Sequence, residues 1–211
     1  MGVMNSRSTV PPLEVLHPES FKVRWLRAEN CMRAKKLTNA LAIFEELATE
    51  GYSEAYVEIG NILEQRDSRD SRADLEAARS WYMKAIEEIE DPEAYIGLAR
   101  LALRGHKDAG NTDDALEYLN IAARANRPVA FIILGTLYHT GKVVPRDLSK
   151  AADFYTKAIA VGYILPLFYL AKIELELGHY IKFLRLRLKA FLNARKLAET
   201  DRHDPRLWHV W

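Results

Sequence analysis

Two interleaved motifs recur along this chain every 36 to 39 residues, and this repetition constrains the fold more than any other feature. The anchor of the first motif steps by 39, 36 and 36 residues, and the anchor of the second by 38, 37 and 36. The first anchors are Ala55, Ala94, Ala130 and Pro166, and the second are Ala40, Ala78, Ala115 and Ala151. A repeat of this length is typical of solenoids, in which each unit contacts only its neighbours.

Each unit contains two segments in which small and large apolar residues recur at helical spacing. We call the segment with the first motif the A helix and the other the B helix. No segment has the pattern of a strand, so the sequence predicts an all-α fold. The expected helices cover residues 20–35, 37–50, 53–65, 74–89, 92–104, 112–126, 128–140, 148–161, 164–177 and 179–199.

Glycine, proline and aspartate mark the expected ends of these helices. Glycine adopts the left-handed conformation that ends a helix, and proline in the first turn loses no hydrogen bond. Aspartate before a helix caps its N-terminus or opposes its dipole. The expected C-terminal caps are Gly51, Gly105, Gly141, Gly162 and Gly178. The expected start signals are Asp74, Pro92, Asp113 or Asp114, Pro128 and Asp147.

Residues 130–162 carry the most specific form of the repeat. They combine Ala130, Leu134, Gly135, Leu137, Tyr138, Gly141, Asp147, Lys150, Ala151, Phe154, Tyr155, Ala158 and Gly162. This pattern resembles the Sel1-like repeat, a relative of the tetratricopeptide repeat, and the resemblance covers residues 53–178 and more weakly 20–52 and 179–199. It implies a right-handed α-solenoid of about five antiparallel helix pairs whose A helices line a concave face. It also implies a bacterial scaffold or adaptor that binds other proteins.

The repeat boundaries divide the chain into three parts. We expect a flexible N-terminal arm over residues 1–19, a repeat domain over 20–199 and a C-terminal tail over 200–211. The expected units are 20–52, 53–90, 91–127, 128–163 and 164–199. The last unit departs from the pattern, because Pro166 stands at its anchor position.

Composition narrows the classes of protein further. The chain has 211 residues, of which 49% are hydrophobic and 28% charged, so it has enough apolar material for a core and is not a disordered chain. Its formal net charge of +1 argues against a nucleic-acid partner. No apolar run approaches the roughly 20 residues that span a bilayer, and the first residues lack a signal-peptide pattern. We therefore expect a cytoplasmic protein, or a periplasmic one if a signal peptide has been removed.

The sequence carries no signature of an enzyme. It lacks a phosphate-binding loop, an H-E-x-x-H motif and a nucleophile elbow. The lone Cys31 excludes an internal disulfide and a zinc site built from several thiolates, and the histidines are scattered. We expect no catalytic activity, no cofactor and no metal.

The A helices supply the first candidate binding surface. By analogy with tandem helical pairs, four positions of each A helix face the concave side, and together they form a half-apolar stripe that is acidic toward the N-terminal repeats. This stripe suits a protein or peptide partner with basic residues at one end, although the same residues also suit contacts between repeats or with solvent. The expected partner-facing residues are Glu54, Val57, Asn61, Glu64, Glu93, Ile96, Arg100, Leu103, Ile132, Thr136, His139, Phe168 and Lys172, with Val129, Leu165 and Leu175 completing the rows.

Residues 179–198 supply the second candidate surface, a basic amphipathic helix without an acidic residue. Its expected basic surface consists of Lys182, Arg185, Arg187 and Lys189. One interpretation is a terminal helix that covers the last repeat and leaves its bases in solvent. The others are a peripheral membrane or envelope-assembly component that contacts anionic lipid, and contact with an acidic protein surface. The tail, with Trp208 and Trp211, is expected to dock on the last helices or to mediate self-association.

Overall fold

The computed structural model describes residues 20–66, 71–105, 110–200, 204 and 206, and this part of the chain contains ten helices and no strand. The expected arm over residues 1–19 and nearly all of the tail beyond residue 200 lie outside the described residues. The helices are α1 (Phe21–Arg33), α2 (Leu37–Thr49), α3 (Ala55–Gln65), α4 (Ser71–Ile89), α5 (Pro92–Leu103), α6 (Thr112–Arg124), α7 (Pro128–Thr140), α8 (Leu148–Ala160), α9 (Leu165–Glu176) and α10 (Tyr180–Thr200).

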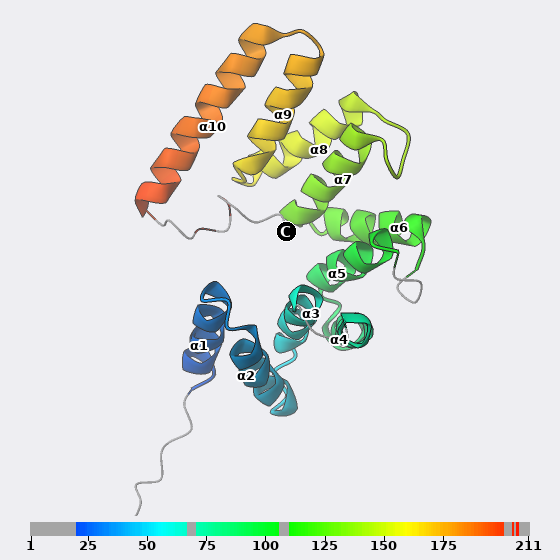
Figure 1. Ribbon diagram of the computed structural model, residues 1–211, viewed down its shortest axis with the longest axis vertical. Coiled ribbons are helices and arrows are strands. Elements are labelled where there is room, and N and C mark those ends of the chain that lie inside the picture. Colours follow the sequence, from blue (N-terminus) through cyan, green and yellow to red (C-terminus); the bar gives the residue numbers. More distant parts are fainter. Residues whose placement is uncertain (1–19, 67–70, 106–109, 201–203, 205, 207–211) are drawn as a thin grey trace, which may run out of the picture.

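The helices pack in chain order, each against the next. The contacts are most extensive within the pairs α1–α2, α3–α4, α5–α6, α7–α8 and α9–α10, and α3 also touches α5. Figure 1 shows these pairs stacked into an arc that begins at α1 and ends at α10. The prediction of an all-α solenoid of about five helix pairs is therefore confirmed.

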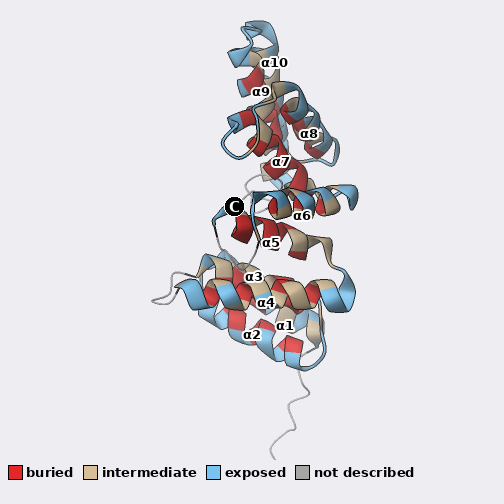
Figure 2. Cartoon of the chain, turned by 90° about the vertical axis from the view of Figure 1, so that its right-hand side faces the viewer, coloured by how far each residue is buried: buried red, intermediate tan, exposed pale blue. Residues whose placement is uncertain are grey.

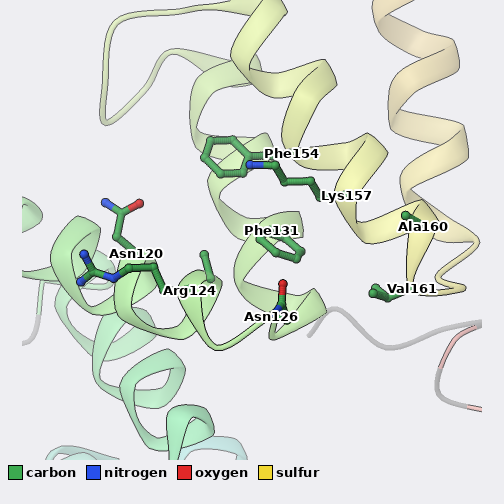
Figure 3. A pocket seen from close by; sticks show the side chains of 9 residues that line it. Asn120, Arg124, Asn126, Phe131, Phe154, Lys157, Ala160 and Val161 are labelled. Atoms are coloured by element: carbon green, nitrogen blue, oxygen red, sulfur yellow. The ribbon is translucent and has the colours of Figure 1, made fainter.

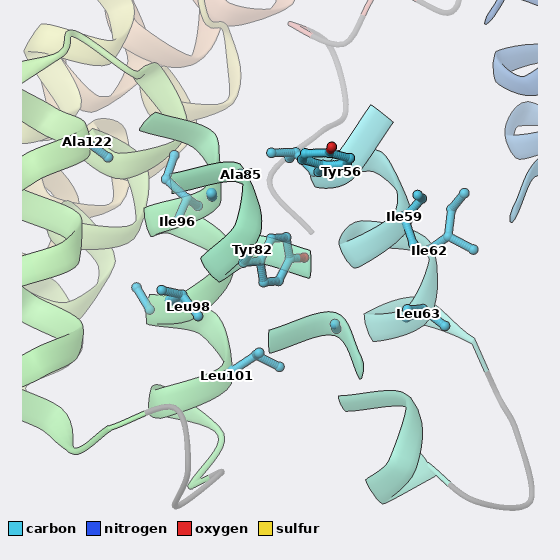
Figure 4. Packing of buried hydrophobic residues seen from close by; sticks show 14 of the residues in the cluster. Tyr56, Ile59, Ile62, Leu63, Tyr82, Ala85, Ile96, Leu98, Leu101 and Ala122 are labelled. Carbon is cyan, nitrogen blue, oxygen red and sulfur yellow. The ribbon is translucent and has the colours of Figure 1, made fainter. Parts of the chain in front are cut away.

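Small residues let neighbouring A helices approach an aromatic ring between them. A Cβ atom at Gly60 of α3 would lie 2.5 Å from Tyr82 Cε1, and one at Gly97 of α5 would lie 2.3 Å from Tyr82 Cζ. The ring of this α4 tyrosine therefore fills the space between two helix backbones, as Figure 4 shows. Gly135 of α7 holds Tyr155 of α8 in the same way, with 2.6 Å between its Cβ position and Tyr155 Cε1.

The helix ends follow most of the predicted signals. All five predicted glycine caps have positive φ, and Pro92 and Pro128 begin their helices. The Asp147 side chain accepts a hydrogen bond from the Lys150 backbone N–H at 2.9 Å, which caps α8.

Two predicted start signals need correction. α4 begins at Ser71, so Asp74 lies inside its first turn, where Arg66 donates two hydrogen bonds to its carboxylate at 2.8 and 3.1 Å. α6 is capped by Asn111, whose side chain accepts hydrogen bonds from the backbone N–H groups of Asp113 and Asp114. Asp114 closes the capping box by accepting from the Asn111 backbone N–H at 2.7 Å.

Burial is greatest in the middle of the solenoid. One apolar cluster extends from Ala28 to Leu137, and smaller clusters join α7, α8, α9 and α10. Figure 2 shows buried residues along the inside of the stack and mostly exposed residues on α10. Ala190 is the one residue that α10 buries fully among the described residues.

Candidate functional site

The predicted partner-facing residues separate into interior and accessible sets. Val57, Ile96 and Ile132 are 5% exposed or less, and His139 is 7% exposed. These four are corrected to interior residues, because the neighbouring helices cover this part of each A helix. Glu54 and Lys172 are exposed, and the partly buried members are Asn61, Glu64, Glu93, Arg100, Leu103, Thr136 and Phe168.

Three of the partly buried residues join Tyr82 in a hydrogen-bonded network. The Tyr82 hydroxyl donates toward Asn61 Oδ1 and Glu64 Oε2, both at 3.0 Å. Arg100 Nη2 donates to Asn61 Oδ1 at 2.8 Å and to Glu64 Oε2 at 2.7 Å. Arg104 adds an ion pair to Glu64 at 3.0 Å. We call these five residues the Tyr82 cluster.

The Tyr82 cluster is chemically closed. The Glu64 side chain is 3% exposed and faces two guanidinium groups, so its buried charge is compensated. Burial is the largest influence on Tyr82 and raises the pKa of its phenol well above the ordinary tyrosine value. Burial opposes the charge of Arg100, but hydrogen bonds and charge from Glu64 outweigh it and raise the pKa of the guanidinium. The cluster therefore joins α3, α4 and α5, and its Tyr82 and Arg100 side chains keep their protons at neutral pH.

Two other carboxylates, Glu58 and Glu93, are compensated less fully than Glu64. Burial raises the pKa of Glu58 on α3, and the charges of Glu29, Glu93 and Asp91 raise it further, while a hydrogen bond from Asn61 opposes the shift. Burial also raises the pKa of Glu93, with Arg127 opposing and Asp91 adding to the shift. We call Glu58 and Glu93 the acidic site, with Asp91 as a neighbouring charge.

Arg127 does not complete the acidic site. Its Nε lies 3.6 Å from Glu93 Oε1, beyond hydrogen-bond distance, and this buried nitrogen has no hydrogen-bond partner. The carboxyls with raised pKa values favour the entry of a positively charged group, whereas the unpartnered Arg127 N–H would take a hydrogen-bond acceptor. The acidic site is thus the electrostatically incomplete part of the A helices.

Sequence reasoning placed Glu93 on this surface but missed Glu58, Asp91 and Arg127. The signal for Glu58 was its position one turn after Glu54, which stacks two carboxylates on α3. Asp91 and Arg127 were hidden because they lie at helix starts, where Asp91 caps α5 and Arg127 precedes Pro128.

The C-terminal part of the A-helix row contains a contact between repeats. His139 Nε2 lies 3.2 Å from Glu176 Oε1, and Arg146 forms an ion pair with the same carboxylate. Burial opposes the charge of Glu176, but the hydrogen bonds and charges of His139 and Arg146 lower its pKa. His139 is therefore held between α7 and α9. Phe168 contacts Arg187 of α10, whose guanidinium carbon is 5.2 Å from the ring centre.

An open cleft of about 720 Å³ lies among α6, α7 and α8, outside the predicted surfaces. Figure 3 shows Phe131 and Phe154 in this cleft, with the Lys157 chain beside them and Arg124 across from them. Lys157 Nζ is 5.3 Å from the Phe154 ring centre, a cation–π distance. The cleft therefore combines apolar surface with two basic groups.

The described residues contain no group of three or more histidine, cysteine, aspartate or glutamate side chains that could hold a metal ion. No helix in this part of the chain is long and apolar enough to cross a membrane. The groups that remain available for a ligand are the acidic site, the cleft and the surface of α10.

Fold and surface together define an α-helical solenoid of the kind that serves as a scaffold. The chain belongs to the Sel1 repeat family, whose model matches residues 53–88, 92–126 and 132–163. These segments correspond to the second, third and fourth units predicted from the sequence.

Similar proteins share the repeat architecture. The chain is 39% identical over 69 residues to the alginate biosynthesis protein AlgK of Pseudomonas syringae pv. tomato, a match that covers 33% of this chain and only 14% of AlgK. The crystal structure of a Sel1 repeat protein from Oxalobacter formigenes superposes with a TM-score of 0.62 at 18% identity, covering 88% of this chain and 82% of that one. The crystal structure of the c5321 antigen of uropathogenic Escherichia coli superposes with a TM-score of 0.59 at 21% identity. This match covers 84% of this chain and 40% of that one. At these identities the structural matches show a shared fold.

Proposed function

We propose that this chain is a non-catalytic scaffold that binds a protein or peptide through its A-helix face, with a lysine or arginine of the partner entering the acidic site. The observation that carries this proposal is the pair of partly buried carboxyls, Glu58 and Glu93, whose pKa values are raised chiefly by burial, with neighbouring acidic charge adding to the shift. Membership in the Sel1 repeat family supports the scaffold role. The match to AlgK spans about two repeat units, so it too supports the shared scaffold.

A partner cation in the acidic site would supply the additional positive charge that Glu58 and Glu93 lack in the free chain. An opposite charge within a few ångströms favours the ionised form of a carboxyl, so binding would lower the pKa values of Glu58 and Glu93. Binding would therefore release protons when the pH lies near their raised pKa values. The Tyr82 cluster would keep the neighbouring helices fixed, because its own charges are already paired.

A peptide-display selection against the folded chain tests this proposal. We expect the selected peptides to share a lysine or arginine at one position, flanked by apolar residues. The variant with Glu58→Gln and Glu93→Gln should bind these peptides at least about tenfold more weakly, because it loses two charge-assisted contacts. Affinity is measured by calorimetry in two buffers of different ionisation enthalpy, which also reports proton release.

A matched control variant carries Glu87→Gln and Glu117→Gln, which remove the same charge from exposed positions on α4 and α6. It should bind the selected peptides like the wild type. Two results would contradict binding at the acidic site. One is that the selected peptides share no basic residue, and the other is that they bind the wild type and the Glu58/Glu93 variant with equal affinity.

A further inference from the structure

The outer face of α10 is apolar and uncovered. Six of its large side chains are between 53% and 69% exposed, and no other helix in the described part of the chain exposes as many; α1 exposes two, Val23 at 51% and Leu26 at 53%. Helical spacing places the six on one side of α10, whereas Leu186, Ala190, Ala194 and Leu197 on the opposite side join the cluster with α9. The exposed residues, which we call the α10 stripe, are Tyr180, Ile181, Leu184, Leu188, Phe191 and Leu192.

Positive charge flanks the α10 stripe. No acidic residue occurs between residues 177 and 198, and Arg185, Lys189 and Lys196 pair with no acidic group among the described residues. Other bases of α10 are engaged: Lys182 lies 3.8 Å from Glu174, and Arg195 lies 3.1 Å from Glu199. By helical spacing the three unpaired bases share one flank of the stripe, about a quarter turn from its centre.

The surrounding structure argues against a protein cover for this face. The backbone carbonyl of Arg206 accepts a hydrogen bond from Ile164 N–H at 3.3 Å, so Arg206 lies at the start of α9. Where helices approach closely elsewhere in the described solenoid, glycine lies against a buried tyrosine, as Gly60 and Gly97 do at Tyr82 and Gly135 does at Tyr155. The α10 stripe has no such small residue. Antiparallel pairing with a second α10 would also bring the two basic flanks together.

We propose that the outer face of α10 docks on an anionic lipid surface. A helix of 21 residues is about 32 Å long. Its row of large apolar side chains, uninterrupted by small residues, can insert into the boundary between lipid headgroups and acyl chains, which deforms to fit them. Unpaired lysine and arginine beside such a stripe reach the lipid phosphates while their aliphatic stems stay apolar. The helix would lie along the surface with its packed side still on α9.

Vesicle flotation tests this docking with the full chain. The vesicles contain phosphatidylcholine alone or phosphatidylcholine mixed with phosphatidylglycerol. We expect the wild type to float only with the anionic vesicles and to be released by high salt. Reversing two bases, Arg185→Glu with Lys189→Glu, should lower the partition coefficient at least about thirty-fold. Replacing stripe residues, Leu184→Ser with Leu188→Ser, should also lower it at low salt.

The control is Lys36→Glu with Lys142→Glu, which makes the same charge change at exposed positions far from α10 and should float like the wild type. Circular dichroism verifies that each variant keeps the helical spectrum. The proposal is overturned if the wild type floats equally with both vesicle types or with neither, or if the control loses as much binding as the Arg185/Lys189 variant. Concentration-dependent dimerisation that the Leu184/Leu188 variant abolishes, with no flotation of the wild type, would assign the stripe to a second copy instead.

Discussion

At the scale of single residues, we expect Glu58 to affect stability and partner binding in opposite directions. Because burial and like charges raise its pKa in the folded chain, its charged form is disfavoured there, and the folded state gains stability at acid pH. That gain is lost as the pH rises through the ordinary glutamate pKa of about 4.3 and then through the raised value. Glu58→Gln should therefore raise the Tm by about 2–4 °C at neutral pH and leave it nearly unchanged near pH 4.

Thermal melts followed by circular dichroism at the two pH values measure this difference. The same variant is expected to weaken peptide binding, so its stability and its affinity should move in opposite directions. A residue that served only the fold would not show this opposition. A lower Tm at neutral pH would mean that the Glu58 carboxylate is compensated in the folded chain, which contradicts the account of the acidic site.

At the scale of helices, the packing of α3, α4 and α5 depends on the missing side chain at Gly97. Glycine to alanine inside a helix normally stabilises a protein by about 1 kcal/mol. Here the added methyl would meet the Tyr82 ring, so Gly97→Ala should destabilise the chain by about 1–3 kcal/mol. Urea unfolding measures the change. In a Tyr82→Ala background the sign should reverse, and a double-mutant cycle without coupling would refute the close contact.

The helices themselves were predictable because period, glycine caps and prolines agree along most of the chain. The start of α4 was not predictable. The sequence does not show that Arg66 lies next to Asp74, and this contact places Asp74 inside a first turn that begins at Ser71. Asn111, rather than Asp113 or Asp114, caps α6 because Asn111 and Asp114 form a capping box together.

At the scale of the whole molecule, repeat register assigned a half-apolar stripe to one side of each A helix but did not show which of its residues stay accessible. Val57, Ile96 and Ile132 occupy that side and are buried, because neighbouring helices of the stack pack against these positions. The charge balance was equally hidden. Glu64 was expected to belong to an acidic end but is neutralised by Arg100 and Arg104, whereas burial and nearby acidic charge raise the pKa of Glu58.

Stability should also vary along the solenoid, since each repeat is held only by its neighbours. α5 buries most of its length between α4 and α6, whereas α10 is covered on one side only. Amides of α10 should therefore exchange with deuterium at least about tenfold faster than those of α5 under native conditions. Hydrogen exchange resolved by mass spectrometry measures the two helices in one sample. Equal protection of both would show that the repeats open as a single cooperative unit, and the terminal pair would then be as stable as the centre.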